Sequence, residues 1–194
     1  GNGLASNPFV EPGDDLSLNR SKVFQLGLRN PWRLSVDSGT GQLYIGDTGL
    51  ASYEEINTGV PGANFGWPLY EGAQGFNSRT PGYRDLGVVK SLYPQVDATP
   101  AEIALKHQAG TDVVVLGSIV YGSELGFQYE GDLFYNDLAR GIVRHANILE
   151  DGSIGSISVF TTGAQFVVDI QQGVDGSLYY VNLLEGTVGK WTLA

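Results

Sequence analysis

Residues 170–182 read IQQGVDGSLYYVN, and this stretch decides the fold class. It consists of two strand-like runs joined by a turn built on Asp175-Gly176. Glycine supplies the positive φ that tight hairpin turns require, and aspartate tolerates the same region of backbone conformation. The stretch therefore predicts a β-hairpin whose second strand ends at Asn182.

The same pattern recurs elsewhere in the chain. Residues 32–37 and 42–47 read WRLSVD and QLYIGD and are separated by a Gly-rich turn, while residues 131–137 (GDLFYND) repeat the second half of the unit. Each unit ends in Asp or Asn. Repeated antiparallel sheets of this kind build β-propellers, so we predict an all-β propeller fold.

Strand-like runs separated by turn signals extend along most of the chain, and no segment of helical length keeps a 3.6-residue period. We expect at most one or two helical turns in Pro100–His107. Roughly ten to thirteen strands, or about three blades, fit in the sequence. The clearest predicted strands are Lys22–Leu28, Trp32–Asp37, Gln42–Asp47, Val113–Tyr121, Asp132–Asn136, Ile142–Leu149, Ser156–Thr161, Val167–Gln171, Ser177–Asn182 and Thr187–Leu193.

One stretch, Gly72–Asp112, breaks this rhythm because it has little alternation and contains several prolines. We predict a long inter-blade loop here, either a surface excursion or a functional insertion. Three blades do not close a ring, and their open edges would favour aggregation. We therefore expect the missing blades to come from another segment or chain, or a homodimer to complete the ring. The start of the sequence, Gly1-Asn2-Gly3-Leu4, suggests a processed or cut chain.

The excess of acidic residues limits the kinds of molecule that the chain is expected to bind. The chain has 11 Lys and Arg against 21 Asp and Glu, a net charge of −10, which disfavours nucleic acids and anionic membranes but suits cations. Cysteine is absent, so disulfides and thiolate metal sites are excluded. No apolar run is long enough to span a bilayer.

Several segments resemble the soluble quinoprotein glucose/sorbosone dehydrogenase family, whose members include PQQ-dependent aldose sugar dehydrogenases. Residues 27–34 (GLRNPWRL) are similar to its signature G-x-R-N-P-x-G. Residues 53–57 (YEEIN) and 61–68 (PGANFGWP) resemble a second family block. The resemblance implies a six-bladed β-propeller, of which residues 1–194 are the C-terminal half. Further matches are residues 46–49, 117–121, 131–134 and 175–179.

The resemblance also implies a chemistry. The family oxidises sugars or other alcohols with PQQ, held with a calcium ion at the central mouth. The general-base histidine lies upstream of this chain, so no catalytic residue is expected in it. Arg29 and Asn30 match the pair that contacts the quinone, a role that suits a guanidinium. Gly49 and Leu50 match the residues whose main-chain carbonyls hold the calcium of the cofactor.

A second, structural calcium site is implied at Glu54, Glu55 and Phe65, where a carboxylate and main-chain carbonyls offer the oxygen ligands that Ca²⁺ prefers. The alternative interpretation is a solvated acidic pair beside a buried aromatic residue. The two histidines have other expected roles. We expect His107, in the long loop, to be a packing or hydrogen-bonding residue, and His145 to be solvated.

Departures from the family pattern weaken the catalytic prediction. Trp32 and Leu50 stand where Gln and Pro are usual. Residues 163–169 (GAQFVVD) lack the arginines of the segment G-x-x-R-D, so a tricarboxylate cofactor would lose counter-charges. We therefore predict a chain that is incomplete or inactive alone. The alternative is a non-catalytic propeller module that binds a protein or glycan, or a structural repeat of a larger secreted or surface protein. We expect an extracellular or periplasmic location and a possible sugar ligand.

Overall fold

The computed structural model describes residues 1–50, 52–72, 97–107 and 114–192. Within these ranges the chain forms β-strands and two short 3₁₀ helices, η1 (Asn19–Lys22) and η3 (Phe127–Tyr129), and no α-helix. None of these described residues belongs to a helix that could cross a membrane. The all-β prediction is confirmed. The strands are β1 (Pro31–Val36), β2 (Leu43–Asp47), β3 (Tyr53–Thr58), β4 (Ile103–Lys106), β5 (Val114–Ile119), β6 (Leu133–Asp137), β7 (Ile142–Ile148), β8 (Ile154–Thr162), β9 (Val167–Gln172), β10 (Leu178–Asn182) and β11 (Thr187–Trp191).

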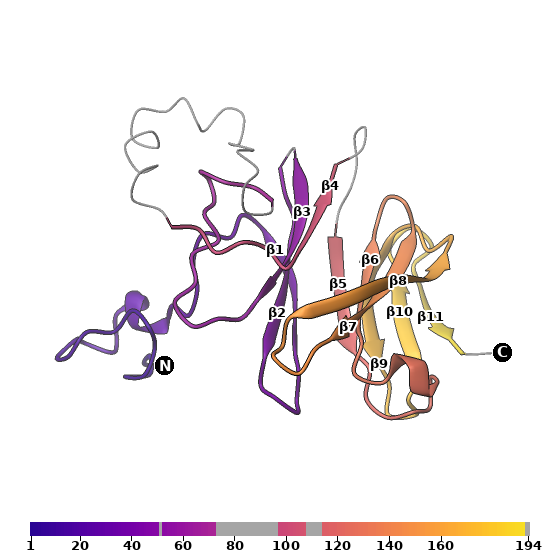
Figure 1. Ribbon diagram of the computed structural model, residues 1–194, viewed down its shortest axis with the longest axis horizontal. Coiled ribbons are helices and arrows are strands. Elements are labelled where there is room, and N and C mark those ends of the chain that lie inside the picture. The colour runs from indigo at the N-terminus through magenta and orange to yellow at the C-terminus, as the bar shows by residue number, and fades with distance from the viewer. Residues whose placement is uncertain (51, 73–96, 108–113, 193–194) are drawn as a thin grey trace.

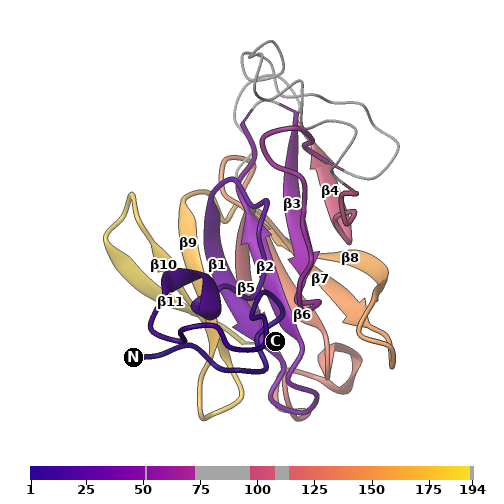
Figure 2. The ribbon, with the colours of Figure 1, turned by 90° about the vertical axis from the view of Figure 1, so that its left-hand side faces the viewer.

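The strands form three antiparallel sheets. The first has the order β1-β2-β3-β4, the second β5-β6-β7-β8, and the third, with three strands, β11-β10-β9. Figure 1 shows the sheets side by side in chain order. Figure 2 shows the N-terminal segment crossing the side of the first sheet that faces away from the other two. The expectation of about three propeller-type blades is confirmed for the described part of the chain.

The core is divided between the two inter-sheet spaces. Side chains of a strand alternate between the two faces of its sheet, so a sheet between two others must be apolar on both faces. In β6, Leu133 and Tyr135 pack against the first sheet, while Phe134 packs toward the third, and all three are fully buried. The first cluster contains Tyr44, Ile56, Ile103, Ile119 and Ala146 besides, and the second contains Val120, Leu125, Val143, Ala164, Val167, Ile170 and Leu178.

Polar side chains also connect the sheets, at the end opposite to the start of β1. The hydroxyl of Tyr121 donates to Asp37 Oδ1 at 2.8 Å and accepts from the backbone N–H of Ser38 at 2.6 Å. Gln172 of β9 pairs with the backbone of the same tyrosine, its Oε1 lying 2.9 Å from the N–H and its Nε2 3.0 Å from the carbonyl oxygen. Tyr121 thus joins all three sheets.

The predicted hairpin turns are present. Gly41 and Gly176 have φ values of 76° and 75°, which glycine adopts without strain. The repeat of Asp or Asn at strand ends is structural as well, because the four residues concerned are all buried: Asp47, Asn136, Asp137 and Asn182.

Two predictions about the first third of the chain were wrong. Lys22–Leu28 is not a strand, because it contains the end of η1 and only one isolated bridge, from Leu26 to Asn64. In contrast β3, which we did not predict, is a central strand of the first sheet. Its six residues are all buried, but four of them are polar, so it lacks the apolar alternation of a strand.

The prediction of helical turns in Pro100–His107 was also wrong. Residues 103–106 form β4, which pairs with β3 from Tyr53↔Lys106 to Ile56↔Ile103. Pairing with a distant partner overrides the weak local preference. The predicted inter-blade loop, Gly72–Asp112, is therefore interrupted by a strand, and the rest of it lies mostly outside the described residues, as do the predicted strand ends at Val113 and Leu193.

The core packing leads to a prediction. Leu178 is fully buried among the second and third sheets, so Leu178→Ala should lower the free energy of unfolding by about 2–5 kcal/mol. Val174 is fully exposed at the hairpin turn, and Val174→Ala should change the free energy of unfolding by less than about 0.5 kcal/mol. Urea denaturation measures both variants. An equal loss of stability in the two variants would contradict this placement of the core.

Candidate functional site

The site surrounds the buried carboxylate of Asp47, at the end of β2. Its Oδ2 accepts a hydrogen bond from the backbone N–H of Arg29 at 2.9 Å, and its Oδ1 accepts one from Asn30 at 2.6 Å. Asp47 is 3 % exposed. The strand-end aspartate thus fixes the backbone of the two residues predicted to contact a quinone.

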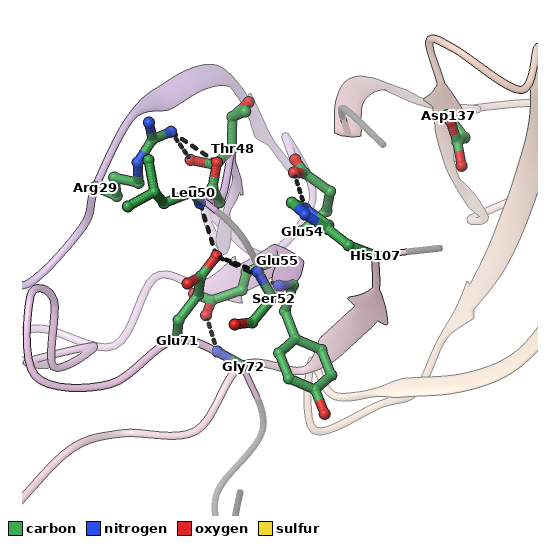
Figure 3. A network of polar contacts seen from close by, with 12 residues as sticks. Arg29, Thr48, Leu50, Ser52, Glu54, Glu55, Glu71, Gly72, His107 and Asp137 are labelled. Carbon is green, nitrogen blue, oxygen red and sulfur yellow. Dashed lines mark hydrogen bonds and ion pairs between the residues drawn. The ribbon is translucent and has the colours of Figure 1, made fainter. Parts of the chain in front are cut away.

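The guanidinium of Arg29 lies over the segment that follows β2. Its Nη1 donates to the carbonyl oxygens of Thr48 at 2.8 Å and Gly49 at 2.7 Å (Figure 3). Its Cζ lies 5.6 Å from the centre of the Trp67 ring. The structure therefore brings together Arg29, Asn30 and Gly49, three of the residues proposed from the sequence to bind the cofactor. It also shows that the carbonyl predicted to bind calcium already accepts from an arginine.

Glu71, which we did not predict as a site residue, holds the other side of this segment. Its Oε1 accepts from the backbone N–H groups of Leu50 at 2.6 Å, Ser52 at 3.1 Å and Tyr53 at 3.3 Å (Figure 3). The side chain of Leu50 itself is exposed. The only sequence signal for this role was the position of Glu71 just after the PGANFGWP block.

Glu54 and Glu55 point to opposite faces of β3. Glu54 is buried on the face toward the second sheet, where its Oε1 lies 2.6 Å from His107 Nε2. Glu55 is buried on the other face, where its carboxylate accepts from the backbone N–H of Gly72 and from Asn57 Nδ2. The solvated acidic pair is thus wrong as an interpretation, whereas the hydrogen-bonding role expected for His107 is confirmed.

A small cavity lies on the Glu55 face. Its volume is about 10 Å³, the space of one water molecule or one ion, so an organic cofactor could lie only outside it. Glu55 and Phe65 both line it, but Glu54 does not. Among the described residues, no three His, Asp or Glu side chains converge to hold a metal ion by themselves. The other lining residues are Gly27, Arg29, Asp47, Gly49, Trp67, Tyr70 and Glu71.

Burial perturbs the carboxylates of this cavity. It raises the pKa of Glu55 to about 7, although the hydrogen bonds from Gly72 and Asn57 oppose the shift. Burial also raises the pKa of Asp47 above its usual range, against the backbone N–H groups of Arg29 and Asn30. The Glu55 carboxyl is therefore only partly ionised near neutral pH.

Two further sequence predictions concern other parts of the molecule. His145 is not solvated, because its Nδ1 lies 2.5 Å from Asp132 Oδ2 and its side chain is 17 % exposed. The segment without arginines, residues 163–169, leads into β9 and buries Val167 and Val168, so these two valines add packing, and the charged side chain of the segment is the acidic Asp169.

A larger cavity of about 310 Å³ lies at the opposite end of the first two sheets. It combines the half-exposed ring of Tyr121 with acidic and amide side chains. Sequence reasoning did not find it, because its lining comes from turns of different strands. The lining residues are Asp37, Thr40, Gln42, Ile119, Tyr121, Gly131, Ile148, Leu149, Glu150, Asp151 and Gly152.

The arrangement of the three antiparallel sheets defines a propeller-type β protein. The model of the family "Glucose / Sorbosone dehydrogenase" matches residues 1–188. The chain therefore belongs to the glucose/sorbosone dehydrogenase family, as the sequence motifs indicated.

Individual relatives agree with this assignment. The chain is 31% identical over 149 residues to the HIPL1 protein of Arabidopsis thaliana, covering 73% of this chain and 20% of the relative. It is 27% identical over 178 residues to the aldose sugar dehydrogenase YliI of Escherichia coli (strain K12), covering 89% of this chain and 43% of the relative. The chain thus spans less than half the length of these curated relatives.

Solved structures show the same fold. A glucose dehydrogenase crystal structure superposes with a TM-score of 0.72 at 21% identity, covering 98% of this chain and 51% of that one. The PQQ-bound aldose sugar dehydrogenase of Streptomyces coelicolor gives a TM-score of 0.62 at 20% identity, covering 94% of this chain and 43% of that one. These neighbours are larger chains that continue beyond the matched sheets.

The buried Glu55 leads to a pH prediction. Its pKa is about 7 in the folded chain and about 4.5 when exposed, so folding favours its protonated form. This contribution is complete below about pH 4.5 and is lost as the pH rises through about 7. It amounts to at most about 3 kcal/mol.

We therefore expect Glu55→Gln to flatten the decline of stability between pH 5 and 8, measured by urea unfolding in the presence of a chelator. The exposed Glu130 provides the control, and Glu130→Gln should leave the pH dependence unchanged. Parallel profiles for the wild type and Glu55→Gln would contradict the assignment.

Proposed function

We propose that this chain supplies part of the cofactor site of a PQQ-dependent propeller that oxidises a sugar or another alcohol. The observation that carries the proposal is the position of Arg29, fixed by Asp47 and lying on the carbonyl oxygens of Thr48 and Gly49. The match to the family over residues 1–188 supports it.

The residues present fit one end of such a cofactor. Arg29 carries five N–H donors, so it can hold the two carbonyls through Nη1 and still bind a quinone or carboxylate oxygen through others. Asn30 would add its amide, and Gly49 and Leu50 would offer carbonyl oxygens to the accompanying calcium. Bound PQQ would be the oxidant of the sugar hydroxyl. We place no general base in this chain.

The chain needs further blades to complete the ring. Leu34 is 65 % and Val36 52 % exposed on the first sheet, and Val188 is 72 % exposed on β11 of the third. Such apolar residues on the outer sheets are suited to contact with neighbouring blades. These would come from another segment, another chain or a second copy, and the mass of this 20.7 kDa chain in solution separates the last case from the others. We propose an extracellular or periplasmic location.

Cofactor binding gives the direct test. We expect PQQ with Ca²⁺ to bind the chain in a calorimetric titration, and Arg29→Gln to weaken that binding at least about tenfold because charge-assisted hydrogen bonds are lost. Arg20, which pairs with Asp14 at an exposed site, is the control, and Arg20→Gln should bind like the wild type. Dye reduction with aldoses should stay at background for the chain alone. No binding at saturating PQQ would refute the proposal.

A calcium ion at the second predicted site is proposed separately. The cavity has the volume for one ion, and Glu55 and Phe65 line it, whereas Glu54 is engaged by His107. Millimolar Ca²⁺ should therefore raise the melting temperature by about 5 °C relative to chelator. The increase should persist in Glu54→Gln and disappear in Glu55→Gln. An equal melting temperature of the wild type in Ca²⁺ and in chelator would refute calcium binding at this site.

The alternative function is a non-catalytic module that binds a glycan or protein. One observation favours it: the cavity of about 310 Å³ has the size of a sugar site and joins the Tyr121 ring to carboxylate and amide groups. A glycan array is the direct assay, and PQQ-dependent turnover by this chain would exclude the alternative.

A further inference from the structure

Arg33 departs from the family signature in a way that the structure makes informative. The signature G-x-R-N-P-x-G ends in glycine, and this chain has arginine at that position. Arg33 lies in β1 beside an irregularity of the ladder, where Pro31 pairs with Asp47 and Arg33 with Gly46. Trp32 is thus an extra residue, as in a β-bulge, and bulges near binding sites change the direction of the next side chain.

The register determines where Arg33 points. After the bulge, Ser35 pairs with Tyr44, whose side chain belongs to the core between the first and second sheets. Residues two apart in a strand share a face, so Arg33 lies on this same face. Its side chain reaches the third sheet, where Nε lies 3.6 Å from Oδ1 of Asp169 in β9. Arg33 therefore connects the first and third sheets at the end where β1 and β9 begin.

The ion pair with Asp169 leaves N–H donors of the Arg33 guanidinium available for another ligand. Oδ1 of Asp169 also accepts from the backbone N–H of Ile170 and from Gln171 Nε2, both at 3.1 Å. The ion pair at 3.6 Å is longer than a charge-assisted hydrogen bond of about 2.7–2.9 Å. The other contact of Arg33 is a long one, from Nη1 to the carbonyl of Trp32 at 3.3 Å. Its side chain is 38 % exposed.

We propose that Arg33 binds a carboxylate of the anionic cofactor, as a second cation in addition to Arg29. This inference rests on the proposed function. Arg33 would supply from β1 a positive counter-charge, which residues 163–169 lack. Its guanidinium can bind a carboxylate bidentately. Asp169 then acts as the resting partner that the carboxylate replaces. Arg29 differs from Arg33 because its Nη1 is committed to two carbonyl oxygens.

The experiment is a calorimetric titration of PQQ with Ca²⁺ into the chain and four variants. Arg33→Gln should weaken binding about tenfold, and Arg33→Lys should lie between, because lysine keeps the charge and loses the bidentate geometry. Asp169→Asn should strengthen binding severalfold, because it removes the negative charge that competes for Arg33 and leaves only a weaker, neutral acceptor. Arg20→Gln is the matched control and should bind like the wild type.

The outcomes separate this inference from the proposed function. If the wild type binds no PQQ, the proposed function and the inference both fail. If the wild type binds PQQ and Arg33→Gln binds it equally well, the inference alone fails. The melting temperature of each variant is measured alongside, and Arg33→Gln should keep that of the wild type, since exposed ion pairs contribute little. If Arg33→Gln does not fold, the Asp169→Asn variant tests the inference instead. An unchanged affinity of Asp169→Asn for PQQ overturns it.

Discussion

The alternation of side chains along each strand is the constraint on which this molecule depends. It places Leu133 and Phe134 in different cores, so the second sheet requires a neighbour on each face. It also sends Glu54 and Glu55 to opposite sides of β3, one toward His107 and the other into the small cavity. A single geometric rule thus determines both the packing of the sheets and the division of the acidic pair into two separate sites.

Polar residues at the strand ends are the second organising element. Asp47 binds the backbone of Arg29 and Asn30, and Asn182 Nδ2 donates to the carbonyl of Gln165 at 3.1 Å. A buried polar group is tolerated when it is hydrogen-bonded, and here each one orders a loop. The same repeat that marks the blades in the sequence therefore also shapes the loops in which the candidate site lies.

The sequence predicted those parts of the fold that local patterns specify. The β9–β10 hairpin was predictable because its turn contains Asp175-Gly176 and lies between two strand-like runs. The polar strand β3 and the strand β4 were not, since their pairing depends on residues far apart in the chain. Among the candidate site residues, the proximity of Arg29, Asn30 and Gly49 follows from a motif in which they are close in the sequence or at the end of β2. Glu71 acts through backbone N–H groups brought to it by the fold, and no local pattern indicates such contacts.

The position of β4 has a consequence for folding. The chain leaves the first sheet at Thr58 and returns only at Ile103, whereas β1, β2 and β3 follow one another through short connections. Closing so long an excursion costs more chain entropy than closing a hairpin, and contacts between distant residues form slowly. Docking of β4 is therefore the late step in assembling this sheet, and separation of β4 is the early step in its opening. The backbone amides of this edge strand would then be the first of the sheet to exchange with solvent.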